Sequence, residues 1–94
     1  MKTIRKYQVP IKGRFFLALA KEDVVLSFQC QDGVPTIWVE RNTAHVEVAR
    51  WFRLYDSEQP IENIPEGAGL HYIGTAQEGP GFTSVWHLFE EVKQ

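Results

Sequence analysis

The residues best equipped for ligand chemistry are two arginines and two aromatics that stand close together in the chain. Arg50, Trp51, Arg53 and Tyr55 all fall within residues 50–55. Arginine holds phosphate groups with its planar guanidinium, and Trp and Tyr stack on nucleobases. The same residue types dominate the hot spots of protein interfaces. They also fit a core in which arginine stems cover buried tryptophans. The cluster therefore predicts a nucleotide pocket, a protein or self-association surface, or core packing.

Two histidines extend this set if the last hairpin of the chain centres on Gly79. In that register His71 lies opposite His87. Tyr72 then lies opposite Trp86. A cross-strand histidine pair holds a metal ion when a third ligand joins it, or a phosphate when it is protonated. A shift of one residue separates the two histidines, and two partly exposed histidines without a ligand are the simpler interpretation. The candidate ligand-binding residues are Arg50, Trp51, Arg53, Tyr55, His71, Trp86 and His87.

No recognisable motif supplies a nucleophile or a tuned acid–base pair. Cys30 falls on the apolar side of its predicted strand, where a thiol is usually a small buried side chain. Ser27 and Ser84 lack the Gly-x-Ser-x-Gly elbow of hydrolases. The chain has no His-Glu-x-x-His stretch and no phosphate-binding glycine loop. We therefore expect a non-enzymatic protein with no catalytic residue, no metal and no cofactor.

The elements that position these residues are short strands, because apolar residues alternate with polar ones instead of recurring every three or four positions. Turn-forming residues separate the strands, among them Asp32 and Gly33, a pair suited to positive φ. The strand pattern occurs in residues 4–9, 14–19, 24–31, 37–41, 44–55, 70–76 and 83–91. This predicts an all-β fold, a small antiparallel β-sandwich or barrel of about seven strands, in a single domain over residues 1–94.

The same pattern predicts three finer features. One strand is expected to bury a face that carries Val24, Leu26, Phe28 and Cys30. The alternation within residues 44–55 changes sense between Val48 and Trp51, which predicts a β-bulge or a bend. Residues 56–69 form the longest irregular segment, and long loops on small scaffolds often carry function.

Composition excludes several classes of function. The 94 residues include 10 basic and 12 acidic side chains with a formal charge of −2, so the chain lacks the positive field of a general duplex nucleic-acid binder. Its longest apolar run, residues 15–20, is far shorter than the roughly 20 residues of a membrane span. We expect no membrane contact and a cytoplasmic location. The 6 Phe, 3 Tyr and 3 Trp are difficult to bury in so small a core, which predicts a homodimer or larger homo-oligomer.

Several stretches resemble a small family of phage- and prophage-encoded domains that has no assigned activity. They are residues 4–7 with 9–10, residues 25–35 with Trp38, and residues 72–75 and 85–90. The resemblance covers most of the chain and implies a phage origin and a compact β-rich fold. It supplies no site residue.

From these observations we expect a phage-encoded binding protein that counteracts host antiviral defence in the host cytoplasm. It would sequester a nucleotide signal, such as a cyclic or ADP-ribose-type nucleotide, or block a host defence protein. The alternative is a virion or assembly component that acts through protein–protein contacts. Under the nucleotide hypothesis, Arg53→Ala is expected to abolish ligand binding and to shift the melting temperature by only a few degrees.

Overall fold

All regular structure in the described part of the chain is β-strand. The computed structural model describes residues 1–9, 13–57, 59–61, 64, 66–78 and 84–93. Its strands are β1 (Lys2–Gln8), β2 (Gly13–Ala20), β3 (Val24–Gln31), β4 (Val34–Asn42), β5 (Glu47–Asp56), β6 (Ala68–Glu78) and β7 (Ser84–Lys93). The seven strands confirm the all-β class predicted from the alternation.

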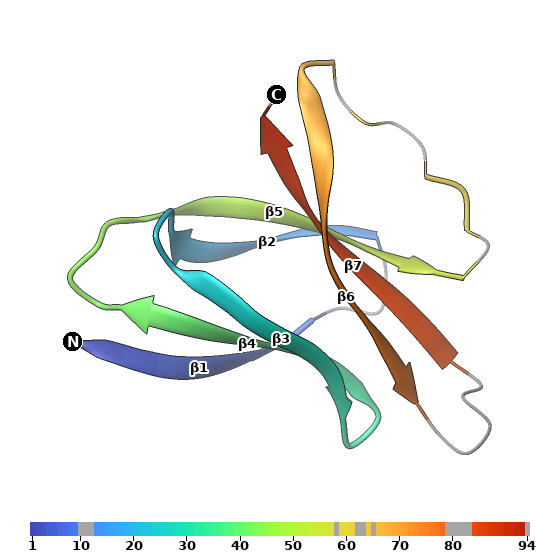
Figure 1. Cartoon of the computed structure of the whole chain (residues 1–94), viewed down its shortest axis with the longest axis horizontal. Helices are drawn as coiled ribbons and strands as arrows, with labels where there is room; N and C mark the ends of the chain where they lie inside the picture. Colours follow the sequence, from blue (N-terminus) through green and yellow to red (C-terminus); the bar gives the residue numbers. More distant parts are fainter. Residues whose placement is uncertain (10–12, 58, 62–63, 65, 79–83, 94) are drawn as a thin grey trace.

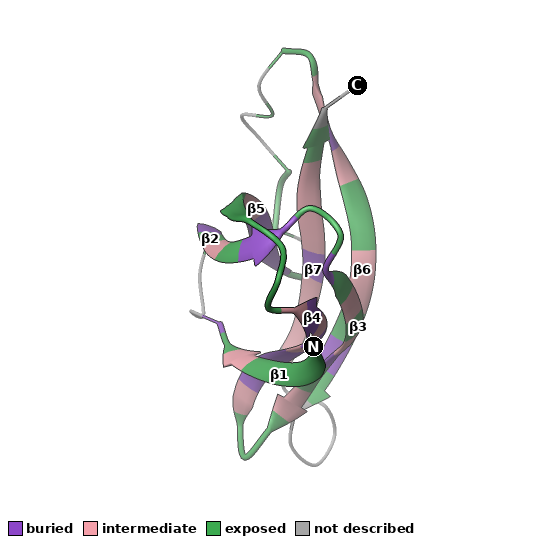
Figure 2. Cartoon of the chain, turned by 90° about the vertical axis from the view of Figure 1, so that its left-hand side faces the viewer, coloured by how far each residue is buried: buried purple, intermediate pink, exposed green. Residues whose placement is uncertain are grey.

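The strands form two antiparallel sheets that pack against each other (Figure 1). The three-stranded sheet has the order β1-β4-β3, and the four-stranded sheet has the order β2-β5-β7-β6. Two edge strands, β3 and β6, lie side by side (Figure 2). Within the described residues no strand pairing joins the two sheets, so the fold is sandwich-like and not a closed barrel.

The core lies between the two sheets and draws side chains from both. Ile37 and Val39 of β4 are fully buried in the three-stranded sheet. Phe52 of β5 and Leu88 of β7 are fully buried in the other sheet. The ring of Phe52 stacks on that of Phe15 from β2, with centroids 5.5 Å apart. Removal of these apolar side chains from water is the main force that holds the sheets together.

The turn predicted at Asp32 and Gly33 is confirmed, but it is shorter than expected, because the return strand begins at Val34 and not at Ile37. Gln31 pairs with Val34, so the two residues between them make the turn. Asp32 has a φ of 51° and Gly33 a φ of 80°. A two-residue turn with positive φ at both positions matches the right-handed twist of the strands that it joins.

The predicted buried face of β3 is wrong for its first half. The pairing of β3 with β4 is irregular between Val25 and Ser27. Val24 and Leu26 are 52% and 47% exposed, whereas Phe28 is buried. A bulge adds one residue to the strand and reverses the alternation on one side of it, so the inward positions before the bulge begin at Val25 instead of Val24.

Of the bulge or bend predicted in β5, the bulge is wrong. β5 pairs with β2 without interruption, from Leu54 opposite Gly13 to Glu47 opposite Ala20. The change in alternation has another cause, because β5 gains its second neighbour, β7, only from Phe52 onward. From that point side chains on both faces of the strand are covered.

The predicted pairing of His71 with His87 is wrong as well. His71 lies opposite Glu90, and His87 lies opposite Thr75. Tyr72 likewise lies opposite Phe89 and not opposite Trp86. Two features explain the difference in register. The pairing of β6 with β7 is irregular between Tyr72 and Gly74. The last pair of these two strands, Glu78 with Ser84, is also symmetric about a position two residues beyond Gly79. The expected turn itself, residues 79–81, lies outside the described residues.

Candidate functional site

Many of the arginine and aromatic side chains lie on the outer face of the four-stranded sheet, the side away from the core. Phe52 and Leu54 of β5 belong to the core, and side chains alternate across a strand. Trp51, Arg53 and Tyr55 therefore face outward. The residues paired with them on β2 and β7 share this side. Tyr72 of β6 shares it as well, because it is paired with Phe89 of β7. We call it the aromatic face; its members are Arg14, Phe16, Trp51, Arg53, Tyr55, Tyr72, His87, Phe89 and Glu91.

The aromatic rings of this face lie in two groups of contacting rings that together include all four strands, and we call them the aromatic row. Phe16 of β2 and Trp51 of β5 have ring centroids 5.1 Å apart. Phe89 of β7 lies 5.8 Å from Tyr55 and 5.4 Å from Tyr72 of β6. Tyr55 is buried, whereas Phe16 and Tyr72 are 54% and 53% exposed. The row therefore ends on both sides in a large side chain that contacts solvent.

Glu91 of β7 is the electrostatic centre of the aromatic face. Arg14 donates to both of its carboxylate oxygens, at 2.7 and 3.0 Å, and Arg53 donates from Nε at 2.7 Å. The hydrogen bonds from Arg14, helped by Arg53, hold the pKa of Glu91 below its ordinary value, although partial burial opposes them. The guanidinium of Arg14 also lies 3.9 Å from the ring centroid of Trp51. Two guanidinium groups therefore hold the carboxylate of Glu91 in place on this face.

Arg50 lies on the opposite side of β5 and is held by protein groups. Its Nε and Nη2 donate to the two carboxylate oxygens of Glu90, at 2.7 and 2.8 Å. Its Nη1 donates to the backbone carbonyls of Ala20 and Asp23, at 3.0 and 2.6 Å. Arg50 therefore ties the connection between β2 and β3 to β7. A phosphate would reach these donors only by displacing Glu90 or the carbonyls.

The remaining predicted residues lie in three different settings. His87 is on the aromatic face, with Nδ1 3.0 Å from the Thr75 hydroxyl and Nε2 3.0 Å from the Ser57 hydroxyl. His71 is exposed. Trp86 packs against the core, and its buried Nε1 has no hydrogen-bond partner among the described residues. No group of three His, Cys, Asp or Glu side chains in the described part of the chain is placed to hold a metal ion.

The structure thus divides the seven predicted residues. Four lie together on the aromatic face, and Arg50, His71 and Trp86 lie away from it. Sequence reasoning did not identify the other members of this face, Arg14, Phe16, Tyr72, Phe89 and Glu91. They come from three strands outside β5, and only the strand order and register bring them beside it.

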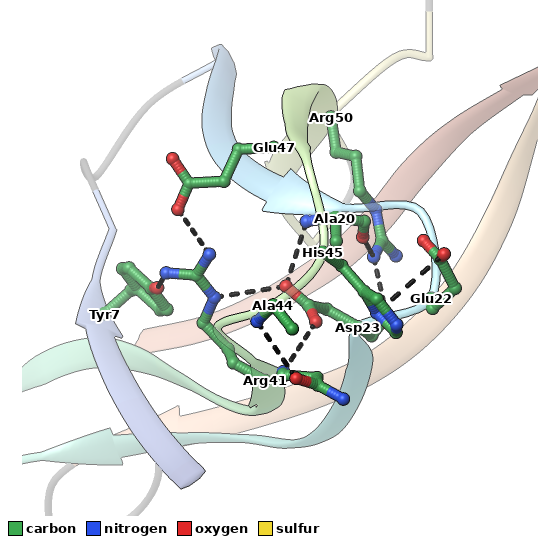
Figure 3. A network of polar contacts seen from close by, with 10 residues as sticks. Tyr7, Ala20, Glu22, Asp23, Arg41, Ala44, His45, Glu47 and Arg50 are labelled. Atoms are coloured by element: carbon green, nitrogen blue, oxygen red, sulfur yellow. Dashed lines mark hydrogen bonds and ion pairs between the residues drawn. The ribbon is translucent and has the colours of Figure 1, made fainter. Parts of the chain in front are cut away.

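A buried ion pair outside the predicted set joins the connection after β2 to β4 (Figure 3). Asp23 and Arg41 are 4% and 6% exposed, and Arg41 Nε donates to Asp23 Oδ2 at 3.1 Å. The backbone N–H groups of Ala20 and Asn42 donate to the same carboxylate, at 2.9 and 3.2 Å. Burial alone raises the pKa of Asp23, but these N–H donors and Arg41 outweigh it and bring the pKa below its ordinary value.

Arg41 extends this network to both sheets. Its Nη1 donates to the Tyr7 hydroxyl of β1 at 3.1 Å, and its Nη2 donates to Glu47, the first residue of β5. The sequence does contain a signal for such a network. Arg41 follows Ile37 and Val39 at alternate positions, so it belongs to the same buried face, and a buried cation requires an acidic partner.

Acidification is expected to destabilise the protein through Asp23 and Glu91. Their pKa values lie below the ordinary values of 3.8 and 4.5. A carboxylate of this kind contributes stability that is complete above its unfolded-state pKa and is lost as the pH falls through its folded-state pKa. The free energy of unfolding attributable to the two groups should therefore stay level down to about pH 5.5 and fall below it. Urea denaturation at pH 7, 5 and 3 measures this effect. The free energy of unfolding of the Glu91→Gln variant is expected to fall less steeply as the pH is lowered. Equal stability of the unsubstituted protein at pH 7 and 3 would contradict the prediction.

The described residues contain no helix long and apolar enough to cross a membrane.

Comparison with known proteins identifies a family and no individual relative. Neither a curated protein nor a solved structure matches the chain. A family model described as a domain of unknown function, DUF7352, matches residues 1–94. Since this match spans the whole sequence, the chain belongs to the DUF7352 family.

Proposed function

We propose that the protein is a non-catalytic binding protein that recognises a protein partner through the aromatic face. The observation that carries this proposal is the exposure of Phe16 and Tyr72 at the two ends of the aromatic row. Aromatic residues and arginine are enriched in the energetically dominant parts of protein interfaces. Trp51 and Phe89 lie beside the exposed rings, so a partner that covers this row would bury aromatic side chains from both groups.

The charge of the face indicates an acidic partner. The guanidinium of Arg14 lies at the surface of this face, with its side chain 46% exposed, while the whole chain has a net charge of −2. Complementary potentials favour association and disfavour contact between like charges. A second copy of this chain would bring its own exposed Arg14 to the contact, so it fits the face less well than an acidic surface on another protein.

The same contacts favour a protein over a nucleotide as the ligand. Arg53 is 8% exposed and Tyr55 is 7% exposed, so neither offers a free group for phosphate clamping or base stacking. The donors of Arg50 are directed at Glu90 and at two backbone carbonyls. In the phage setting that the sequence resemblance implies, the partner would be a host defence protein that the aromatic face blocks; a virion subunit would use the same face for assembly.

Paired substitutions on the two sheets test the proposal. Phe16→Ser with Tyr72→Ser removes both exposed ends of the aromatic row. Ile4→Ser with Val24→Ser removes side chains that are 70% and 52% exposed on the other sheet. In co-purification from host lysate, quantified by mass spectrometry, partner recovery is expected to fall at least tenfold for the first pair and to stay unchanged for the second. Equal losses in both pairs, or none, would overturn the proposal.

A thermal-shift panel completes the test. Cyclic and ADP-ribose-type nucleotides at saturating concentration are expected to leave the melting temperature unchanged. A ligand that binds the native state must raise it. A rise of several degrees would replace protein recognition with nucleotide sequestration.

A further inference from the structure

The four edge strands of the two sheets differ in how far they are covered or protected. β3 and β6 lie side by side. β1 carries Lys2, Arg5 and Lys6, all exposed, and charged residues on an edge strand hinder its pairing with another chain. β2 pairs with β5 alone and lies at one side of the molecule (Figure 2). It contains no lysine, proline or acidic residue, so among the described strands β2 is the edge that remains open to pairing.

The backbone groups at the open edge belong to the even-numbered residues of β2. The N–H group of Ala20 donates to the Asp23 carboxylate at 2.9 Å, and therefore not to β5. In an antiparallel pair, the N–H and C=O groups of alternate residues point to the same side of the strand. Those of Phe16 and Ala18 thus also point away from β5. Within the described part of the chain, no other strand pairs with them.

A large side chain and a small one follow each other along the outward side of this edge. Phe16 pairs with Trp51 of β5, and Ala18 pairs with Ala49 in the next row. Phe16 is 54% exposed, and both alanines are exposed. The ring of Phe16 therefore stands one row away from two side chains that end at Cβ. A strand that fits this edge has a small residue opposite Phe16 and a large residue opposite Ala18.

β2 itself meets this requirement when it is turned antiparallel about Leu17. Phe16 of each copy then lies opposite Ala18 of the other copy, so that each ring covers a position where the side chain is small. The register suits the backbone as well, because these two residues carry the N–H and C=O groups that point away from β5. On the other side of the strand, each partly buried Leu17 meets its equivalent in the close spacing of a non-hydrogen-bonded pair.

The single charged residue of β2 does not oppose this pairing. Arg14 is held by Glu91 of its own chain at 2.7 Å. In the register centred on Leu17, it lies opposite Ala20 of the second copy. The two Arg14 side chains are then separated by the length of residues 14–20, roughly 20 Å at about 3.4 Å per residue. This distance exceeds the Debye length of about 8 Å at physiological ionic strength, so their repulsion is largely screened.

The other charges near β2 lie at the end of the strand and include both signs. Lys21 and Glu22 are exposed neighbours in the turn that follows it. Glu47 pairs with Ala20 across to β5 and is held by Arg41. In the antiparallel arrangement, this end of one copy lies far from the same end of the other. The middle of the contact, residues 15–19, is entirely apolar.

We propose that two copies of this chain associate through β2, antiparallel and with Leu17 at the two-fold axis, so that their four-stranded sheets join into one continuous sheet. Closed two-fold contacts are the commonest form of homo-oligomer. Residues directly opposite each other point to the same side of a sheet, so the two aromatic faces lie side by side on one surface. The inference goes beyond the proposed function, which requires only one copy.

Sedimentation equilibrium of the full chain, over a series of rising concentrations, measures the association. The mass is expected to approach twice the 10.8 kDa of one chain. A mass of one chain at every concentration would overturn the proposal and leave the open edge to a different protein. A mass that continues to rise above two chains would also overturn it, because the pairing proposed here closes after two copies.

Two substitutions that each add a lysine locate the contact. Ala18→Lys places the protective charge of other edge strands on β2 and is expected to raise the dissociation constant of the dimer at least tenfold. Thr3→Lys makes the corresponding change at an exposed residue of β1 and is expected to leave the constant unchanged. Both variants should retain the circular dichroism spectrum of the unsubstituted protein. Equal effects of the two substitutions, or an effect of Thr3→Lys alone, would contradict a contact through β2.

Amide exchange measured by NMR tests the register independently of these variants. In the dimer, the amides of Phe16 and Ala18 are expected to exchange at least tenfold more slowly than in dilute solution, where the chain is monomeric. Slowing confined to the amides of β1 would overturn the proposal. None of these measurements involves another protein, so a chain that stays monomeric leaves recognition through the aromatic face standing.

Discussion

Replacing Asp23 with alanine is expected to lower the free energy of unfolding by about 3 kcal/mol. The Asp23 carboxylate accepts hydrogen bonds from the backbone N–H groups of Ala20 and Asn42 and from Arg41. Its removal leaves these donors without their acceptor, at a site where Arg41 is 6% exposed. Glu47 still contacts Arg41, which limits the loss. The network joins the two sheets, so its loss affects the sandwich as a whole.

Urea denaturation at pH 7 measures this effect, and Asp56→Ala is the matched control. Asp56 is an exposed residue at the end of β5, and substitutions at such positions usually change stability by less than about 0.5 kcal/mol. An unfolding free energy for Asp23→Ala that equals the control value would show that the ion pair contributes no net stability.

Replacing Arg53 with alanine is expected to destabilise the protein by about 2 kcal/mol. Arg53 is 8% exposed and donates to Glu91 at 2.7 Å and to the Tyr55 hydroxyl at 3.3 Å. Its removal takes away a charge-assisted hydrogen bond and the packing of the arginine stem. The sequence alone predicts a ligand-binding role and a nearly unchanged melting temperature for this variant. The contacts in the structure instead indicate a structural role.

Differential scanning calorimetry of the unliganded protein distinguishes these two outcomes. A loss of about 2 kcal/mol corresponds to a fall in melting temperature of roughly 10 °C for a domain of this size. Arg5→Ala is the matched control, because Arg5 is an exposed residue of β1. If Arg53→Ala melts within a few degrees of this control, Arg53 does not support the fold, and the ligand-binding role predicted from the sequence is the better account.

The two substitutions concern parts of the molecule with different purposes. Asp23 and Arg41 hold the sheets together on the side of the core, and no proposed ligand touches them. Arg53 and Glu91 belong to the aromatic face, where Glu91 pairs with both arginines and Arg14 lies over Trp51. Loss of Arg53 would therefore also affect partner binding indirectly, through Glu91, whereas loss of the exposed Phe16 would affect binding without this structural cost.

Local alternation was sufficient to predict the strands and the all-β class. Side chains point to opposite faces of a strand with a period of two, so the outward direction of Trp51, Arg53 and Tyr55 follows from the apolar character of Phe52 and Leu54 between them. The turn at Asp32 and Gly33 was predicted for a similarly local reason, because few residue pairs adopt positive φ at low cost.

The contents of the aromatic face were decided only by the tertiary structure. One-residue irregularities in β3 and β6 reverse the alternation and shift the register, and neither has a local sequence signal as clear as that of the turn. β7 leaves β5 after a short pairing. The ion pairs join Glu91 to Arg14 and Asp23 to Arg41 across 77 and 18 positions of the chain. Such contacts depend on which strands become neighbours. The sequence alone determined the strands, but it did not determine the side-chain directions beyond an irregularity or the order in which the strands pair.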